Sequence, residues 1–176
     1  MLSPLQLDDF ALEHLTISRG KLPTRSTKLP EEIGYSIKAD YGLKKLRRTG
    51  GRPRYSVSLE FQLESQEEDQ FAPVRVVLAG VTGTFSFAVD TPKELLEQLV
   101  PANCLAILYG ILRGIVIQAT SGCSGGCFIL PSLSIHYLIA LKESGDELAE
   151  TVTALTGRPN AKSRPKAKKR ARKKKS

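Results

Sequence analysis

The chain has 176 residues, about the length of one domain. Hydrophobic residues make up 41% and charged residues 25%, which excludes a wholly disordered protein, a collagen and a small disulfide scaffold. The net charge of +8 is unevenly distributed. Of the 26 Lys and Arg, eleven lie in residues 157–176, which contain no acid. The remaining fifteen lie in residues 1–156, where eighteen Asp and Glu outnumber them. A mildly acidic body therefore precedes a strongly basic tail.

The first apolar segment, Leu5–Ile17, has its apolar residues in pairs two positions apart, and each pair is offset by one position from an unbroken alternation. This pattern predicts an irregular strand with bulges, although DDFALEHL alone would also suit a helix. Residues 21–30 contain two prolines among polar residues and predict a loop.

Regular alternation follows. Ile33–Leu43 places its apolar residues on one face, and Arg47–Pro53, with two glycines, predicts a turn. Arg54–Glu64 matches a period of two at five consecutive positions, which is typical of a half-buried antiparallel strand. The apolar residues from 74 to 89 change parity at Ala79–Gly80, so we expect one long bent strand with a bulge at that glycine.

Helical signals begin at Thr91–Pro92, which predicts an N-cap followed by proline at the first helical position. Pro101 predicts an interruption, with a second, apolar helix over about residues 102–120. Phe128–Leu141, FILPSLSIHYLIAL, predicts an extended segment around its proline that finishes as a helix. From Lys142 the sequence is polar, and residues 142–156 are expected to be a linker or helix end.

The compartment is suggested by three features. The start, MLSPLQLDDF, lacks the basic and apolar regions of a signal peptide. Cys104–Ala119, the most apolar stretch, contains Arg113 and is shorter than the roughly 20 residues of a membrane span. The three cysteines are an odd number, against a complete disulfide framework. We expect a cytoplasmic protein that is not an integral membrane protein.

Candidate chemistry is sparse. Cys123 and Cys127 offer two thiolates to zinc, but Cys104, His14 and His136 complete no known four-ligand spacing. A nucleophilic cysteine paired with His136 would lack a third group to orient the histidine. The glycine-rich segment around these cysteines follows an apolar helix and lacks the Lys of a phosphate loop. We expect no catalytic residues, no metal and no cofactor, and therefore no enzyme.

Residues 157–176 are too polar to bury a core and are expected to be disordered. Such a run would release counterions on binding nucleic acid, a ribosome or an anionic membrane surface. It carries no base-reading element, so this binding would be non-specific; a role in solubility is the alternative. The candidate polyanion-binding residues are Lys168, Lys169, Arg170, Arg172, Lys173, Lys174 and Lys175.

Four segments also follow one another in a familiar order. They are LQLDDFALEHLTI, the segment Gly83–Ala88, the segment Asn103–Gly114 with Tyr109 and Arg113 four residues apart, and the proline-containing LPSLSIHYL. In this order they resemble the first strand, the end of the fourth strand, the start of the long helix and the apolar return of the bacterial protein-export chaperone SecB family. The resemblance covers about residues 5–141.

The resemblance implies an α+β fold in which a four-stranded antiparallel sheet packs on a long helix and a C-terminal segment. Residues 1–141 would form this chaperone domain, assembled as a dimer of dimers. The implied function is an ATP-independent holdase that keeps unfolded preproteins on exposed apolar grooves for export, with the SecA motor as a partner. The client-binding residues carried over are Tyr41, Leu43, Leu95, Leu99, Val100, Leu105, Leu108, Tyr109, Leu133, Ile135 and Tyr137.

The sequence departs from the family in two respects. The family's acidic positions that dock the motor correspond to His14, Ser18 and Leu78, and its acidic tail is replaced by a basic one. Three alternatives therefore stay open: a relative that guards an antitoxin in a toxin–antitoxin system, a general holdase on ribosomes or nucleic acid, and a nucleic-acid-associated protein whose body only oligomerises. In each, we expect a dimer or tetramer, because Cys104–Ala119 is more apolar than one small sheet can cover.

Overall fold

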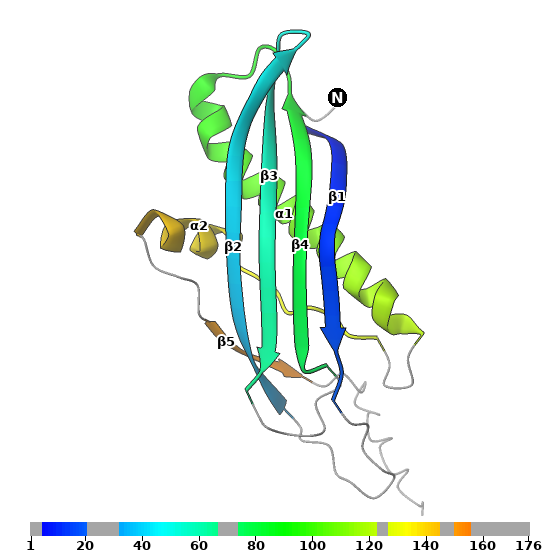
Figure 1. The fold of residues 1–176 in the computed structure, drawn as a ribbon. Coiled ribbons are helices and arrows are strands. Elements are labelled where there is room, and N and C mark those ends of the chain that lie inside the picture. Colours follow the sequence, from blue (N-terminus) through cyan, green and yellow to red (C-terminus); the bar gives the residue numbers. More distant parts are fainter. Residues whose placement is uncertain (1–4, 21–31, 67–73, 123–126, 145–149, 156–176) are drawn as a thin grey trace, which may run out of the picture.

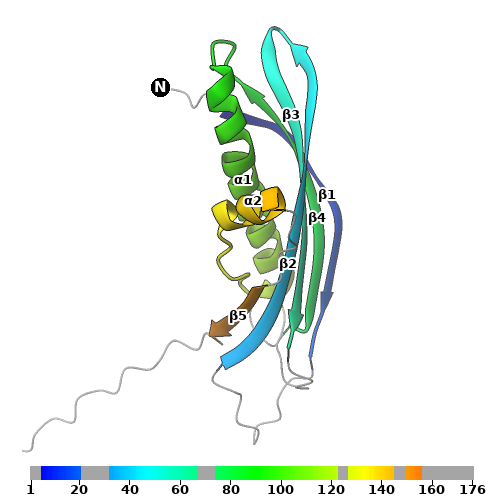
Figure 2. The ribbon, with the colours of Figure 1, turned by 90° about the vertical axis from the view of Figure 1, so that its left-hand side faces the viewer.

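Residues 5–20, 32–66, 74–122, 127–144 and 150–155 are described by a computed structural model, in which an antiparallel sheet carries two helices on one face (Figure 1 and Figure 2). The expected α+β fold class is confirmed. The strands are β1 (Leu5–Ser18), β2 (Glu32–Thr49), β3 (Arg52–Ser65), β4 (Val76–Phe87) and β5 (Glu150–Leu155). The helices are α1 (Lys93–Ser121) and α2 (Ile135–Ser144).

The sheet has the strand order β1-β4-β3-β2-β5. Strands β2, β3 and β4 follow one another as neighbours, and β1 lies beside β4, which is the arrangement of a Greek key. The β2–β3 turn is only Gly50–Gly51, with φ of 56° and 79°, and it is shorter than the predicted Arg47–Pro53. Two glycines permit the left-handed backbone of a two-residue hairpin turn, so both strands continue to its edge.

The bulges expected in β1 are confirmed. Its register against β4 shifts between Leu7 and Asp9 and again between Leu12 and His14. Each shift resets the alternation, so that all three apolar pairs are opposite the core-facing residues of β4.

The bulge expected in β4 is absent, and that prediction was wrong. The register between β3 and β4 runs without a shift from Arg54 opposite Ser86 to Glu64 opposite Val76. Val77 and Ala79 are buried, whereas Leu78 is 36% exposed on the opposite face. The change of parity in the sequence therefore reflects apolar residues on both faces of a regular strand.

Helix α1 is continuous through Pro101, so the predicted interruption was also wrong. A proline at this position removes the hydrogen bond to the carbonyl of residue 97. Glu97 lies on the exposed side of the helix, where water can satisfy that carbonyl. The helix begins at Lys93 with Pro92 as N-cap, one residue later than expected.

The core lies between α1 and the sheet. Helix α1 crosses the sheet face diagonally (Figure 1), with a buried stripe of Leu96, Val100, Cys104, Leu105, Leu108, Tyr109, Leu112, Val116 and Thr120. At Gly83 of β4 the approach is close, since an added Cβ would lie 2.8 Å from a methyl group of Leu108. The glycine therefore sets how closely the helix approaches the strand.

The predicted extended return that ends as a helix is confirmed. Phe128 is held at its start by its N–H, which donates to the Thr120 hydroxyl at 2.8 Å, and its ring lies 5.7 Å from that of Tyr35. The Tyr109 hydroxyl donates to the Pro131 carbonyl. Strand β5, which the sequence analysis did not expect, extends the sheet beside the first residues of β2.

By length and composition, α1 could cross a membrane, with a mean hydropathy of 1.8 over its most apolar window. The buried helix of a soluble core meets the same criterion, and 39% of that window is buried here.

Candidate functional site

Large apolar side chains remain exposed on the helix-bearing side of the molecule. Phe10 and Leu12 face this side from β1, and Leu43 does so from β2, because each lies opposite a core-facing position of its neighbouring strand. Leu95 of α1 and Tyr137 of α2 are exposed on the helices. Exposed apolar groups that gather on one side are characteristic of a surface that contacts a partner.

Five of the predicted client-binding residues are exposed or half-buried on the helix-bearing side, and we term them together the apolar surface: Tyr41, Leu43, Leu95, Leu99 and Tyr137. Leu43, Leu95 and Tyr137 are 43%, 41% and 50% exposed, and the other two are half-buried. They come from β2, the first turns of α1 and the first turn of α2. Helix α2 packs against both β2 and α1 and so links these two elements (Figure 2).

Four other predicted residues lie in the core: Val100, Leu105, Leu108 and Tyr109. Their side chains offer almost no surface to a partner, because they belong to the stripe with which α1 packs on the sheet. Leu133 and Ile135 are half-buried and pack against the same core, as do Tyr41 and Leu99. Leu43, Leu95 and Tyr137 are therefore the most exposed of the predicted residues.

Lys142 ties α2 to β2 beside Tyr41. Its Nζ atom lies 2.6 Å from Oδ1 of Asp40 and 4.5 Å from the centre of the Tyr41 ring, and it also contacts the Tyr41 carbonyl oxygen. The hydrogen bond from Lys142 lowers the pKa of Asp40. Burial, together with the nearby carboxylates of Glu143 and Asp40, raises the pKa of Tyr41. The Tyr41 phenol is therefore neutral at physiological pH, with the Lys142 ammonium over its ring.

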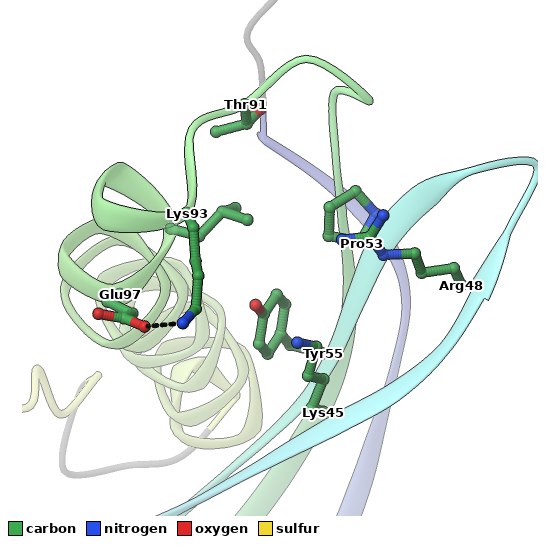
Figure 3. A pocket seen from close by; sticks show the side chains of 8 residues that line it. Lys45, Arg48, Pro53, Tyr55, Thr91, Lys93 and Glu97 are labelled. Carbon is green, nitrogen blue, oxygen red and sulfur yellow. Dashed lines mark ion pairs between the residues drawn. The ribbon is translucent and has the colours of Figure 1, made fainter.

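A cavity of about 450 Å³ lies between the end of the β2–β3 hairpin and the start of α1 (Figure 3). Its walls carry three cationic side chains, Lys45, Arg48 and Lys93, and the phenol of Tyr55. The sequence analysis missed this feature, although a signal was present: KKLRRTGGRPR, residues 44–54, contains six Lys or Arg and no acid.

The three positions at which the sequence analysis expected a departure from the SecB family, His14, Ser18 and Leu78, all belong to the outer face of the sheet. The Nε2 atom of His14 is 3.5 Å from Oε2 of Glu60, and both side chains are about half exposed. The carboxylate beside His14 therefore belongs to β3.

Reactive groups do not converge in the described part of the chain, where no three His, Cys, Asp or Glu side chains are placed to hold a metal. Burial raises the pKa of the Cys104 thiol to about 12, so this cysteine is protonated at neutral pH and a poor nucleophile. Cys127 is exposed and free. Cys123 and all seven polyanion-binding candidates from Lys168 to Lys175 lie outside the described residues.

No family model matches the chain, and no curated protein matches it. Among solved structures, the chain is similar to a SecB-like chaperone of Mycobacterium tuberculosis in complex with a ChAD peptide from an antitoxin. The two are 14% identical, the match covers 74% of this chain and 91% of that one, and the TM-score is 0.47. A likeness of this degree carries no argument about what this chain binds.

Proposed function

We propose that the protein is an ATP-independent holdase that binds unfolded polypeptides on its apolar surface. The observation that carries the proposal is the exposure of Leu43, Leu95 and Tyr137 on β2, α1 and α2, with α2 packed against the other two. An unfolded chain exposes apolar side chains along its length, and non-directional burial of apolar area binds many sequences. Holding by this means consumes no nucleotide.

The basic experiment is suppression of aggregation. A chemically unfolded client is diluted into buffer with and without the full-length protein, and light scattering is followed in the absence of ATP. The proposal expects scattering to fall in proportion to added protein. If scattering is unchanged at a several-fold molar excess of the protein, no holdase activity is present.

The clients in this proposal are either preproteins awaiting export or an antitoxin, and both would be met in the cytoplasm. His14, Ser18 and Leu78 favour the second, because they lack the charge by which the family docks SecA. Titration of the protein with purified SecA distinguishes the two clients. Binding of SecA would favour export, and its absence would favour the antitoxin.

We also propose that the protein assembles as a dimer or as a dimer of dimers. The outward side of α1 is exposed at Ala106, Gly110 and Gly114, where small residues allow another helix to approach closely. Static light scattering at micromolar concentration and moderate salt tests this proposal. A monomer of 19.3 kDa would contradict it.

A second candidate function rests on the eleven Lys and Arg of residues 157–176. In this proposal the tail tethers the protein to nucleic acid, ribosomes or anionic membranes. Binding would weaken steeply with salt, because each neutralised phosphate releases counterions. Changing all eleven Lys and Arg of residues 157–176 to glutamine in the full-length chain, including the seven candidates from Lys168 to Lys175, should abolish this salt-sensitive binding. Unchanged binding to duplex DNA or anionic vesicles would exclude the tail as the tether.

A further inference from the structure

The end of the β2–β3 hairpin concentrates positive charge on a body that is otherwise acidic. Arg54 is partly neutralised by Asp8, with 3.5 Å between the Nε and Oδ2 atoms. For Lys45, Arg47 and Arg48, no carboxylate lies within salt-bridge distance among the residues that the structure describes. These cations are therefore available to a negatively charged partner.

The cavity beside the hairpin directs part of this charge toward α1. Lys45 and Arg48 line it from the hairpin and Lys93 lines it from the helix (Figure 3). Its one carboxylate, Glu97, lies 3.6 Å from the Lys93 ammonium in an exposed pair, which contributes little. The first turn of α1 also begins here, and its N-cap Pro92 makes no side-chain hydrogen bond. The positive end of the helix dipole adds to the attraction for an anion.

The cavity continues directly from the apolar surface. Leu43 precedes Lys45 by two residues on β2, and both lie on the same face, opposite Val57 and Tyr55 of β3. This continuity runs along β2, since on α1 the two-residue spacing of Lys93 and Leu95 places them on different sides of the helix. A polypeptide in extended conformation rises about 3.3 Å per residue. A chain lying on the apolar surface would therefore reach the cationic cavity within a few residues.

We propose that the protein selects client segments in which an apolar stretch is flanked by Asp or Glu, whose carboxylates enter the cavity between the hairpin and α1. This inference rests on the proposed holdase function and specifies its clients. Apolar burial supplies the affinity, and the cations supply preference and orientation, since charge complementarity contributes more to specificity than to affinity. The preference should weaken with salt, because the cavity is open to solvent and its charges are screened.

Nucleic acid is the other polyanion that a cationic hairpin attracts, and the structure favours it less. Binding of single strands uses aromatic rings on which bases stack. The ring at this end of the hairpin, Tyr55, is occupied by an edge-to-face contact with Phe87, at 5.7 Å and 88°. The apolar surface next to the cavity would also have no counterpart in a nucleic-acid backbone.

The test uses three labelled peptides that share one apolar core and differ in their flanks, which are Asp-Asp, Ser-Ser or Lys-Lys. Fluorescence anisotropy measures their affinity for the full-length protein in which all eleven Lys and Arg of residues 157–176 are changed to glutamine, so that the tail carries no positive side chain to attract the acidic peptide. We expect the Asp-flanked peptide to bind about tenfold more tightly than the Ser-flanked one at low salt, equivalent to about 1.4 kcal/mol.

Charge reversal gives the decisive comparison. Lys45→Glu with Arg48→Glu should reverse the order, so that the Lys-flanked peptide binds most tightly. The matched control, Lys38→Glu with Arg75→Glu, changes two exposed cations outside the cavity by the same total charge and should leave the order unchanged. Circular dichroism of both variants checks that they remain folded.

The readouts separate the two proposals. Binding of the Ser-flanked peptide reports the holdase function, and the ratio between flanks reports the charge preference. Equal affinities for all flanks, or equal effects of the two double variants, would overturn the preference while leaving the holdase intact. A third result would also overturn the preference: the Lys45→Glu, Arg48→Glu variant loses affinity for duplex DNA of about 20 base pairs, while the peptides show no discrimination. That result would assign the hairpin to nucleic-acid binding.

Discussion

Removing apolar area from the apolar surface should weaken client binding without unfolding the protein. Leu43→Ser with Leu95→Ser is the sharpest choice, because these side chains are 43% and 41% exposed. Full burial of a leucine contributes about 1.5–3 kcal/mol. The area that each has left for a client is therefore worth about 0.6–1.3 kcal/mol, and the pair about 1–2.5 kcal/mol if the two add. Client dissociation constants should rise roughly 5- to 70-fold.

The assay is fluorescence anisotropy of a labelled unfolded client or apolar peptide at fixed salt. The matched control is Leu12→Ser with Leu78→Ser, since these leucines are 40% and 36% exposed. Leu12 lies on the helix-bearing side but on β1, which β4 and β3 separate from β2, and Leu78 lies on the outer face of the sheet. Oligomer size and the thermal midpoint are recorded for both variants. An equal loss of affinity in the control, or no loss in the test variant, would refute the assignment of the client surface.

Three further predictions concern the scaffold. Thr120→Val leaves the buried N–H of Phe128 without its acceptor and should lower the free energy of unfolding by about 1–3 kcal/mol, whereas Thr120→Ser should cost much less; denaturant titration distinguishes them. Gly83→Val would force β4 and α1 apart, since even a Cβ there lies 2.8 Å from a helix side chain, and should cost about 1–3 kcal/mol; a wild-type thermal midpoint would contradict this contact. Asp40→Asn should lower the midpoint at pH 7. This difference should shrink progressively as the pH falls below the ordinary carboxyl pKa of 3.8 and through the lowered pKa of Asp40, because the pairing with Lys142 stabilises the fold only while the carboxylate is ionised.

Much of the fold could be predicted from local patterns. The offset pairs of β1 identified its two bulges, and the regular alternation of residues 54–64 identified β3. Val76 and Leu78 misled the analysis because period two shows which residues share a face but not which face is buried. Pro101 predicted a break in the helix, because the sequence does not show that the carbonyl of Glu97, which loses its hydrogen bond, is open to water.

The candidate site was only partly accessible from the sequence. Leu43 and Leu95 are exposed, whereas Leu105 and Leu108, equally apolar, are buried, and only the direction in which α1 crosses the sheet decides between them. The cationic cavity was missed for a different reason. A net charge summed over the body cancels the hairpin's lysines and arginines against acids that lie elsewhere, and the cavity needs α1 as its second wall.

The most direct test of the holdase account is site-specific crosslinking to an unfolded client. A photoreactive amino acid, benzoylphenylalanine, is placed at Leu43 in the full-length chain or, as the control, at Leu78, which is similarly exposed on the outer face of the sheet. Each protein is irradiated with a labelled unfolded client, and covalent adducts are quantified on a gel. The account predicts strong crosslinking from position 43 and little from position 78. Equal yields from the two positions, or crosslinking from position 78 alone, would contradict it.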